Sequence, residues 1–370
     1  MHPANRHPRR GAACCALHTN RRPPYVHLSN DVLIFGEALV DFLPEHAGPL
    51  ATVARFERQL GGAPANLAIG LARLGSRAKL LTRVGRDAFG DFLVAALKAQ
   101  HVDVSEVRRA PQGVKTGITF VSVSEDGDRS FLFFREPSAD LTVEHADYAQ
   151  TALDAPILHL GSNLMVYEQG RETTLMLARR AREQGVLVSM DVNLRPHLWA
   201  DPSQAAPTIR ELLPYVNLLK ASKEEAEALV GGARIPAEIY AKLADLGVRC
   251  MALTCGADGA WWFTPSGAFH QPASTVQVVD TTGAGDGFWA GVLHGVCELH
   301  GQETNESSGS DWLARIDQDA WKPVLRLATF VGGRVCERMG ATTGMPHAAE
   351  VPWADLGWPP GRLVPHPDVR

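Results

Sequence analysis

The sequence predicts an α/β fold in which a mainly parallel β-sheet is covered by helices on both faces. Short apolar runs typical of buried strands, such as residues 32–35 and 250–254, alternate with helical patterns along most of the chain. Residues 115–134 break this alternation with the pattern of a β-hairpin. We therefore expect a small second β-sheet that projects from the main body.

The composition excludes several classes of protein. The chain has 370 residues, of which 45% are hydrophobic and 21% are charged, as in an ordinary globular protein. A net charge of −5 does not favour nucleic acid or an anionic membrane as a partner. No apolar run is long enough to span a bilayer. We therefore expect small molecules as the main partners.

The six cysteines show no CxxC pairing and no zinc-type spacing. Most of them lie in or beside apolar stretches, so we interpret them as buried hydrophobic residues of a cytoplasmic protein. Residues 1–30 are rich in arginine and are interpreted as a disordered extension or an over-long start, with a targeting segment as the alternative. The main domain is expected at residues 31–350, and an irregular tail at 351–370.

The repeating pattern assigns the elements of the main domain. Strands are expected at residues 32–35, 79–84, 157–160, 186–191, 216–220 and 250–254, with a further strand-like run at 275–279. Helices are expected at residues 62–74, 89–99, 172–183, near 209–213, from 224 and at 283–294. A polar stretch at 300–311 is expected to form an exposed loop between two C-terminal helices.

The run Asp280-Thr281-Thr282-Gly283-Ala284-Gly285-Asp286 carries the chemistry. Small residues at the start of a helix leave backbone N–H groups uncovered, and such a terminus attracts anions. A carboxylate just beyond would repel a bound phosphate, so Asp286 is better suited to accept a proton from a hydroxyl. The N–H groups of Gly283, Ala284 and Gly285 would then stabilise charge in a phosphoryl-transfer transition state.

The motif at residues 280–286 has three other interpretations: a structural turn, a dinucleotide-binding fingerprint and a P-loop. It can be a tight strand–helix turn in which Asp286 only stabilises the helix terminus. A dinucleotide fingerprint is disfavoured, because the third glycine is misplaced and no βα unit with an acidic residue follows. A P-loop is absent from the sequence.

Two distant motifs together resemble the ribokinase-like (PfkB) family of carbohydrate kinases: residues 61–66 with 85–90, and residues 280–286. Residues 36–41, 134–140 and 191–199 are most similar to bacterial fructokinases. The resemblance implies a ribokinase-like three-layer sandwich with a lid, whose strands would come roughly from residues 38–60 and 112–136. It also implies ATP-dependent phosphorylation of a sugar hydroxyl.

For the sugar, the resemblance implies hydrogen bonds from residues on both sides of the cleft. These substrate-binding residues would be Asp41, Gly61, Gly62, Asn66, Arg135 and Arg195. Turn or helix capping is the alternative for Asp41 and for the 61–66 segment. Similar arginines face a carboxylate in 2-keto-3-deoxygluconate kinases, and a surface ion pair with a neighbour such as Glu136 is the alternative for Arg135 and Arg195.

For the nucleotide, the resemblance implies contacts from Ser222, Thr254, Gly256, Gly259 and Ala328. Ser222 replaces the asparagine of the family's K-x-N-x-x-E element, which puts its phosphate contact in doubt. Glu225 would help to hold Mg²⁺ through water. Its alternative role is a favourable acid in the first turn of a helix.

The resemblance further implies a monovalent cation such as K⁺ near Asp280, Thr282 and Gly340. It allows a homodimer formed through the lid. The expected reaction is the conversion of D-fructose to fructose 6-phosphate with ATP. Phosphorylation of 2-keto-3-deoxygluconate or of a ribose-like sugar is the alternative, and a non-catalytic sugar-binding protein on the same fold is a minor one.

Overall fold

The computed structural model describes residues 31–123, 129–135, 137–301 and 310–358. The N-terminal extension, the expected turn at 126–128, Glu136, most of the polar stretch after His300 and the end of the tail lie outside the described residues.

The main sheet has nine strands in the order β13-β12-β11-β10-β9-β8-β1-β4-β5. Their bounds are β1 Val32–Phe35, β4 Ala78–Val84, β5 Val107–Arg109, β8 Ile157–Gly161, β9 Leu187–Asp191, β10 Leu218–Ser222, β11 Cys250–Thr254, β12 Ala260–Thr264 and β13 Gly267–Gln271. The pairs from β11 to β5 are parallel, and β12 and β13 add an antiparallel hairpin at one edge. The predicted mainly parallel sheet is confirmed.

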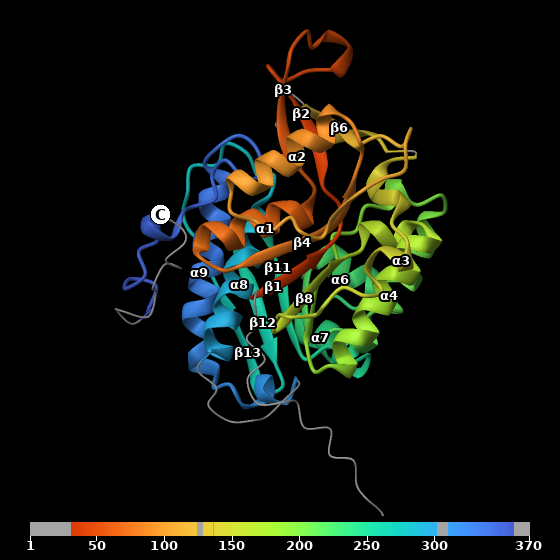
Figure 1. Cartoon of the computed structure of the whole chain (residues 1–370). Helices are drawn as coiled ribbons and strands as arrows, with labels where there is room; N and C mark the ends of the chain where they lie inside the picture. The colour runs from red at the N-terminus through yellow and green to blue at the C-terminus, as the bar shows by residue number, and fades with distance from the viewer. Residues whose placement is uncertain (1–30, 124–128, 136, 302–309, 359–370) are drawn as a thin grey trace, which may run out of the picture.

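Helices cover both faces of this sheet (Figure 1). One layer contains α1 Ala63–Leu74, α2 Ala88–Ala99, α8 Ala284–His300 and α9 Gln318–Cys336. The other contains α3 His145–Tyr148, α4 Glu168–Glu183, α5 Ala205–Arg210, α6 Lys223–Val230 and α7 Pro236–Asp245. Each layer buries its own apolar cluster against the sheet, which gives the predicted three-layer α/β sandwich.

A four-stranded second sheet, here called the lid, projects from the main body (Figure 1). It has the order β3-β2-β6-β7, with bounds β2 Leu39–Pro44, β3 Phe56–Gly61, β6 Ile118–Val123 and β7 Arg129–Phe134. The predicted hairpin is confirmed, because β6 and β7 pair antiparallel. The strand β7 forms one edge and leaves the side chains of Leu132 and Phe134 about half exposed, at 49% and 55%.

One expectation for the main domain was wrong, and one element was not predicted. Residues 275–279 form no strand, and Val278 and Val279 are 61% and 56% exposed. β-Branched residues favour a strand only where a partner strand is available, and the sheet ends at β13. The β12–β13 hairpin was not predicted, although Gly267, with a φ of 147°, marks its turn.

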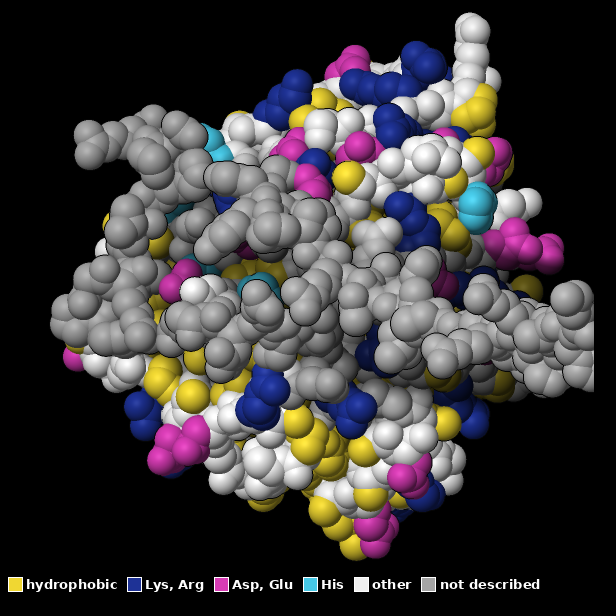
Figure 2. Space-filling model, turned by 60° about the horizontal axis from the view of Figure 1, so that its bottom comes forward, with side chains coloured by type: hydrophobic (Ala, Val, Ile, Leu, Met, Phe, Trp, Pro, Cys, Tyr) yellow, Lys and Arg dark blue, Asp and Glu magenta, His cyan; other side chains and the backbone are white. Residues whose placement is uncertain are grey.

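The surface agrees with the modest net charge of the chain. On the face away from the lid, basic and acidic side chains are interspersed and neither sign forms a continuous field (Figure 2). Within the described part of the chain, no helix combines the length and the apolar character needed to cross a membrane.

Candidate active site

A cleft of about 410 Å³ lies between the lid and the carboxyl ends of the central strands. Most of the site residues that the sequence predicted line this cleft, from elements far apart in the chain. They are Asp41, Gly62, Asn66, Arg135, Arg195, Ser222, Glu225, Thr254, Thr282, Gly283, Gly285 and Asp286. Ligands of α/β folds bind at this edge of a parallel sheet, so the fold itself brings the predicted residues together.

The start of α8 forms the floor of the cleft. Gly283 is the N-cap residue with a φ of 78°, and a Cβ there would lie 2.4 Å from the carbonyl oxygen of Ala341. Only glycine therefore fits this turn. The Ala284 N–H already donates to the Thr281 carbonyl at 3.2 Å. Of the three N–H groups expected to bind an anion, this one is partly committed to the turn.

Asp286 lies in the first turn of α8 and accepts a hydrogen bond of 2.8 Å from Nδ2 of Asn66. Loss of hydration and the nearby Asp191 carboxylate raise the pKa of Asp286 to about 7, although Asn66, Lys220 and Arg195 oppose this shift. A carboxylate whose pKa lies near neutrality is suited to accept a proton from a hydroxyl.

Asp191 and Lys220 also line the cleft, although neither was among the site residues predicted from the sequence. The Lys220 ammonium lies 2.8 Å from both carboxylate oxygens of Asp191, and both residues are almost fully buried at the base of the cleft. Burial acts to lower the pKa of Lys220, but Asp191, Glu225 and Asp286 raise it above its usual value. Lys220 therefore stays protonated and places a positive charge in the cleft. Its position two residues before Ser222, at the end of a strand, was the available signal.

Glu225 and Ser222 form a capping box at the start of α6. The Glu225 carboxylate accepts from the backbone N–H groups of Leu194 and Ser222, each at 2.8 Å. Ser222 Oγ accepts from the Glu225 N–H at 3.2 Å, so serine retains the cap that asparagine would provide. Burial and the Asp191 carboxylate raise the pKa of Glu225.

The donor set around Glu225 bears on the expected Mg²⁺. Among the residues that the structure describes, no group of three or more His, Cys, Asp or Glu side chains could hold a metal ion. Mg²⁺ retains several waters and is commonly held by few carboxylates together with substrate phosphates. A carboxylate that lines the cleft and is held in place by two backbone N–H groups fits this water-mediated role.

On the lid side, Gly61 makes room for Asp41. A Cβ at Gly61 would lie 2.0 Å from Oδ2 of Asp41, so the carboxylate lies directly over this glycine. Gly62, with a φ of 95°, then turns the chain into α1. The two glycines thus position Asp41 and Asn66 on one wall of the cleft.

Arg135 follows β7 and is almost fully buried. Its guanidinium forms an ion pair with Asp140, to which Nε donates at 3.1 Å. Burial opposes the charged form, but Asp140 and Glu37 raise the pKa of Arg135. The alternative of a surface ion pair is therefore wrong, because the pair lies in the interior and its acid is Asp140.

Glu37 and Asn163 also line the cleft, and the sequence analysis did not select them. Asn163 Nδ2 donates to Oε1 of Glu37 at 2.7 Å. The other carboxylate oxygen of Glu37 is buried and has no hydrogen-bond partner among the described residues. Glu37 stands in the motif at 36–41, but no local pattern indicated that it would lie beside Asn163.

The residues expected at the nucleotide separate into two groups. Thr254 lines the cleft, and Gly256 and Gly259 shape the turn that follows it, with φ values of 57° and 91°. Ala328 is fully buried on α9, where Gly291 of α8 packs against its backbone. Its contact with the adenine stays a prediction.

The three residues expected at a monovalent cation are neighbours. Asp280 accepts from the Thr282 N–H at 2.8 Å and from the Gly340 N–H at 2.6 Å. Thr282 Oγ1 is buried and lacks a hydrogen-bond partner among the described residues. Asp280 thus connects the segment before α8 to the turn after α9 through two hydrogen bonds. The Thr282 hydroxyl oxygen beside it is the atom that a cation could bind.

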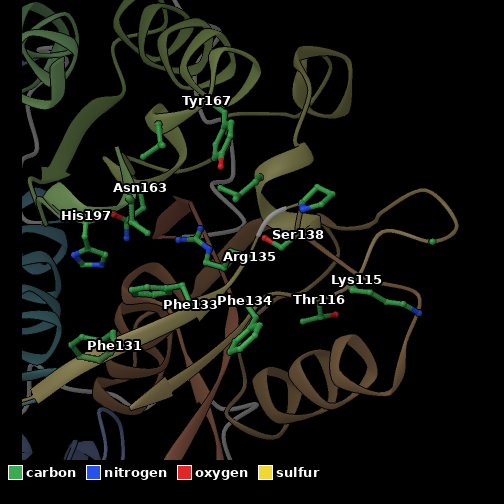
Figure 3. A pocket seen from close by; sticks show the side chains of 15 residues that line it. Lys115, Thr116, Phe131, Phe133, Phe134, Arg135, Ser138, Asn163, Tyr167 and His197 are labelled. Carbon is green, nitrogen blue, oxygen red and sulfur yellow. The ribbon is translucent and has the colours of Figure 1, made fainter. Parts of the chain in front are cut away.

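A second cavity of about 700 Å³ opens beneath β7 (Figure 3). It shares Phe131, Phe133, Arg135 and Asn163 with the cleft. The ring of Phe133 stacks on His197, with 5.3 Å between the ring centroids. Figure 3 shows Arg135 between Tyr167 and Phe133.

Comparison with known proteins gives a consistent result. The model of a family described as pfkB family carbohydrate kinase matches residues 29–348. A probable fructokinase-2 from Arabidopsis thaliana is 32% identical over 323 residues, which cover 86% of this chain and 94% of the relative.

Solved structures show the same similarity. A fructokinase with bound ATP from Xylella fastidiosa superposes with a TM-score of 0.77 at 33% identity, covering 88% of this chain and 97% of that one. A double mutant of a fructokinase from Vibrio cholerae O395, with fructose, ADP and potassium bound, gives 0.75 at 29% identity, covering 86% and 96%.

Proposed function

Because the chain belongs to the pfkB family of carbohydrate kinases, we propose that it transfers the γ-phosphoryl group of ATP to the 6-hydroxyl of D-fructose. The observation that carries this proposal is Asp286, a carboxyl group with a pKa of about 7 at the start of α8, in a cleft lined by hydroxyl-binding side chains. The similar fructokinases, one with ATP bound and one with fructose, ADP and potassium bound, support the choice of both substrates.

In this reaction the sugar hydroxyl lies between Asp286 and the γ-phosphate. Asp286 accepts the hydroxyl proton while the oxygen attacks phosphorus, and the bond to the ADP oxygen breaks. The N–H groups at the start of α8 stabilise the negative charge on the phosphoryl group. The lid side of the cleft, with Asp41 and Arg135, orients the sugar and excludes water, which would otherwise accept the phosphoryl group.

A neutral sugar suits this cleft better than the anionic 2-keto-3-deoxygluconate. Glu37 and Asp41 place two carboxyl groups on the sugar side. The charge of Arg135 is already balanced by Asp140. A substrate carboxylate would therefore meet the Glu37 and Asp41 carboxyl groups, and of the two arginines that line the cleft, Arg135 is already paired with Asp140, whereas sugar hydroxyls can donate to the carboxylates.

The ions and the assembly are part of the same proposal. Mg²⁺ would accompany ATP and contact Glu225 through water, and K⁺ would lie beside Asp280 and Thr282. Two copies would associate through the lid, where Leu132 and Phe134 on the edge strand β7 are exposed. The free thiols of the described cysteines Cys250, Cys255, Cys297 and Cys336 support a cytoplasmic location.

A panel of acceptors tests the substrate. We expect kcat/KM for fructose to exceed that for ribose, 2-keto-3-deoxygluconate and adenosine by at least about tenfold, which corresponds to about 1.4 kcal/mol of transition-state binding. A tenfold preference for another sugar would reject fructose while leaving the kinase assignment in place. A wild-type protein that binds fructose but consumes no ATP with any acceptor would reject the kinase activity itself.

A further inference from the structure

We propose that Lys220 is a further catalytic residue, whose ammonium group binds an oxygen of the transferred phosphoryl group and is held in place by Asp191. This inference rests on the proposed phosphoryl transfer, but not on the identity of the sugar. Lys220 ends in the cleft beside the start of α8, and Asp191 comes from the neighbouring strand β9.

The position of the ammonium follows from its contact with Gly285. A Cβ at Gly285 would lie 3.0 Å from Nζ and 3.2 Å from Cε of Lys220. The end of the lysine side chain therefore lies in close contact with the position that a Cβ at residue 285 would take. Gly285 lies in the first turn of α8 and is one of the residues whose N–H groups are expected to bind the phosphoryl group, so the ammonium lies beside that expected site.

The hydrogen bonds of Lys220 leave one donor for a substrate. An ammonium group has three N–H donors. The two carboxylate oxygens of Asp191, both at 2.8 Å, account for two of them in the described structure. The third is available to an oxygen in the cleft. Lysine commonly binds phosphate as a compact point charge of this kind.

The charges in the cleft explain why such a cation is needed. The Asp191, Glu225 and Asp286 carboxyl groups all act on Lys220. An incoming triphosphate would be repelled by these acids if no cation lay among them. During transfer, the bond from phosphorus to the ADP oxygen breaks with its electron pair, the bond to the sugar oxygen forms, and the sugar proton passes to Asp286. Lys220 keeps its proton throughout and stabilises the charge on the phosphoryl oxygens.

A merely structural role makes a different prediction from this catalytic one. If Lys220 only balances the buried charge of Asp191, then removing both charges together should restore the enzyme, because a buried ion pair can often be replaced by neutral residues without loss of stability. If Lys220 contacts the phosphoryl group, the neutral pair should fold and remain slow. The double variant K220M/D191N separates these two roles.

The experiment compares wild type, K220M, K220M/D191N and K220Q, with the preferred sugar of the acceptor panel and saturating ATP. Rates are measured on the high-pH plateau, where changes in the ionisation of Asp286 no longer limit the rate. We expect K220M/D191N to keep a melting temperature near that of the wild type and a nearly unchanged sugar KM, while kcat falls by about 10²-fold or more. K220Q, which keeps a hydrogen-bond donor to Asp191 without the charge, should show a similar loss.

The ion pair between Lys79 and Asp103 provides a matched control, since it lies on the main sheet outside the cleft. K79M/D103N removes the same two charges and should leave kcat within threefold of the wild type. A kcat of K220M/D191N within threefold of the wild type would overturn the proposal. If K220M/D191N does not fold, K220Q decides, and a rate within threefold of the wild type overturns the proposal in the same way. A wild type that phosphorylates a sugar other than fructose would reject only the substrate assignment.

Discussion

Asn66 Nδ2 donates a hydrogen bond of 2.8 Å to Asp286 Oδ2, which joins the start of α1 to the start of α8 across 220 positions of the chain. The two motifs that the sequence analysis treated as separate, one for the sugar and one for the phosphoryl group, thus meet in a single contact. The hydrogen bond stabilises the ionised carboxylate and lowers the pKa of Asp286 against the effects of burial and of Asp191.

Removal of this contact should change the pH dependence of the reaction. In Asn66→Ala, Asp286 loses a partner that favours its charged form, so its pKa rises further. The acid limb of the kcat profile should move to higher pH, with partial recovery of kcat on the alkaline side. The measurement is a pH–rate profile with saturating ATP and sugar. An acid limb in the same position as in wild type would contradict a role for Asn66 in tuning the base.

Substitution of the base itself should abolish most of the activity. Asp286→Asn keeps the size of the side chain but cannot accept the proton, so kcat should fall by about 10²-fold or more, as general-base effects usually require. Fructose binding, measured by calorimetry, should change little. A rate within threefold of the wild type would reject Asp286 as the base.

The raised pKa of Asp286 also predicts how stability depends on pH. Its folded pKa, about 7, lies above the ordinary value of 3.8 that the unfolded chain would have. The folded state therefore binds the proton more tightly, and the stability from this group is fully present below about pH 4 and lost as the pH rises through 7. Asp286→Asn should thus raise the melting temperature at pH 8 relative to wild type, and by clearly more than at pH 5. An equal change at both values would contradict the assigned pKa.

Local sequence indicated Asp286 as a candidate, because small residues at a helix start and a following carboxylate suit phosphoryl transfer, and the distant motif at residues 61–66 strengthened this prediction. The alternating strands and helices likewise predicted the main sheet. The Lys220–Asp191 pair could not be found in this way, because it depends on β9 and β10 being neighbours in the sheet.

The serine at position 222 should act mainly as a helix cap. Ser222→Ala removes the side-chain acceptor of the Glu225 N–H and should reduce the free energy of unfolding by about 1 kcal/mol. Because the capping box of Ser222 and Glu225 also positions the Glu225 carboxylate at the cleft, KM for Mg–ATP should rise as well. Ser222→Asn, which keeps a capping oxygen, should remain close to wild type in both measurements. Equal losses in the alanine and asparagine variants would contradict the capping role.

Arg135 should be tested together with Asp140, because removal of either side chain leaves the charge of the other buried and unpaired. Asp140→Asn should cost about 3–5 kcal/mol in the free energy of unfolding, since the guanidinium then stays buried without its carboxylate. The double variant R135M/D140L replaces the pair by apolar side chains and should recover most of that stability. It should still raise KM for fructose about tenfold or more, since the lost guanidinium would orient the hydroxyls. Chemical denaturation and steady-state kinetics measure the two effects separately. A double variant with wild-type KM would show that Arg135 serves the fold of the lid and not the sugar.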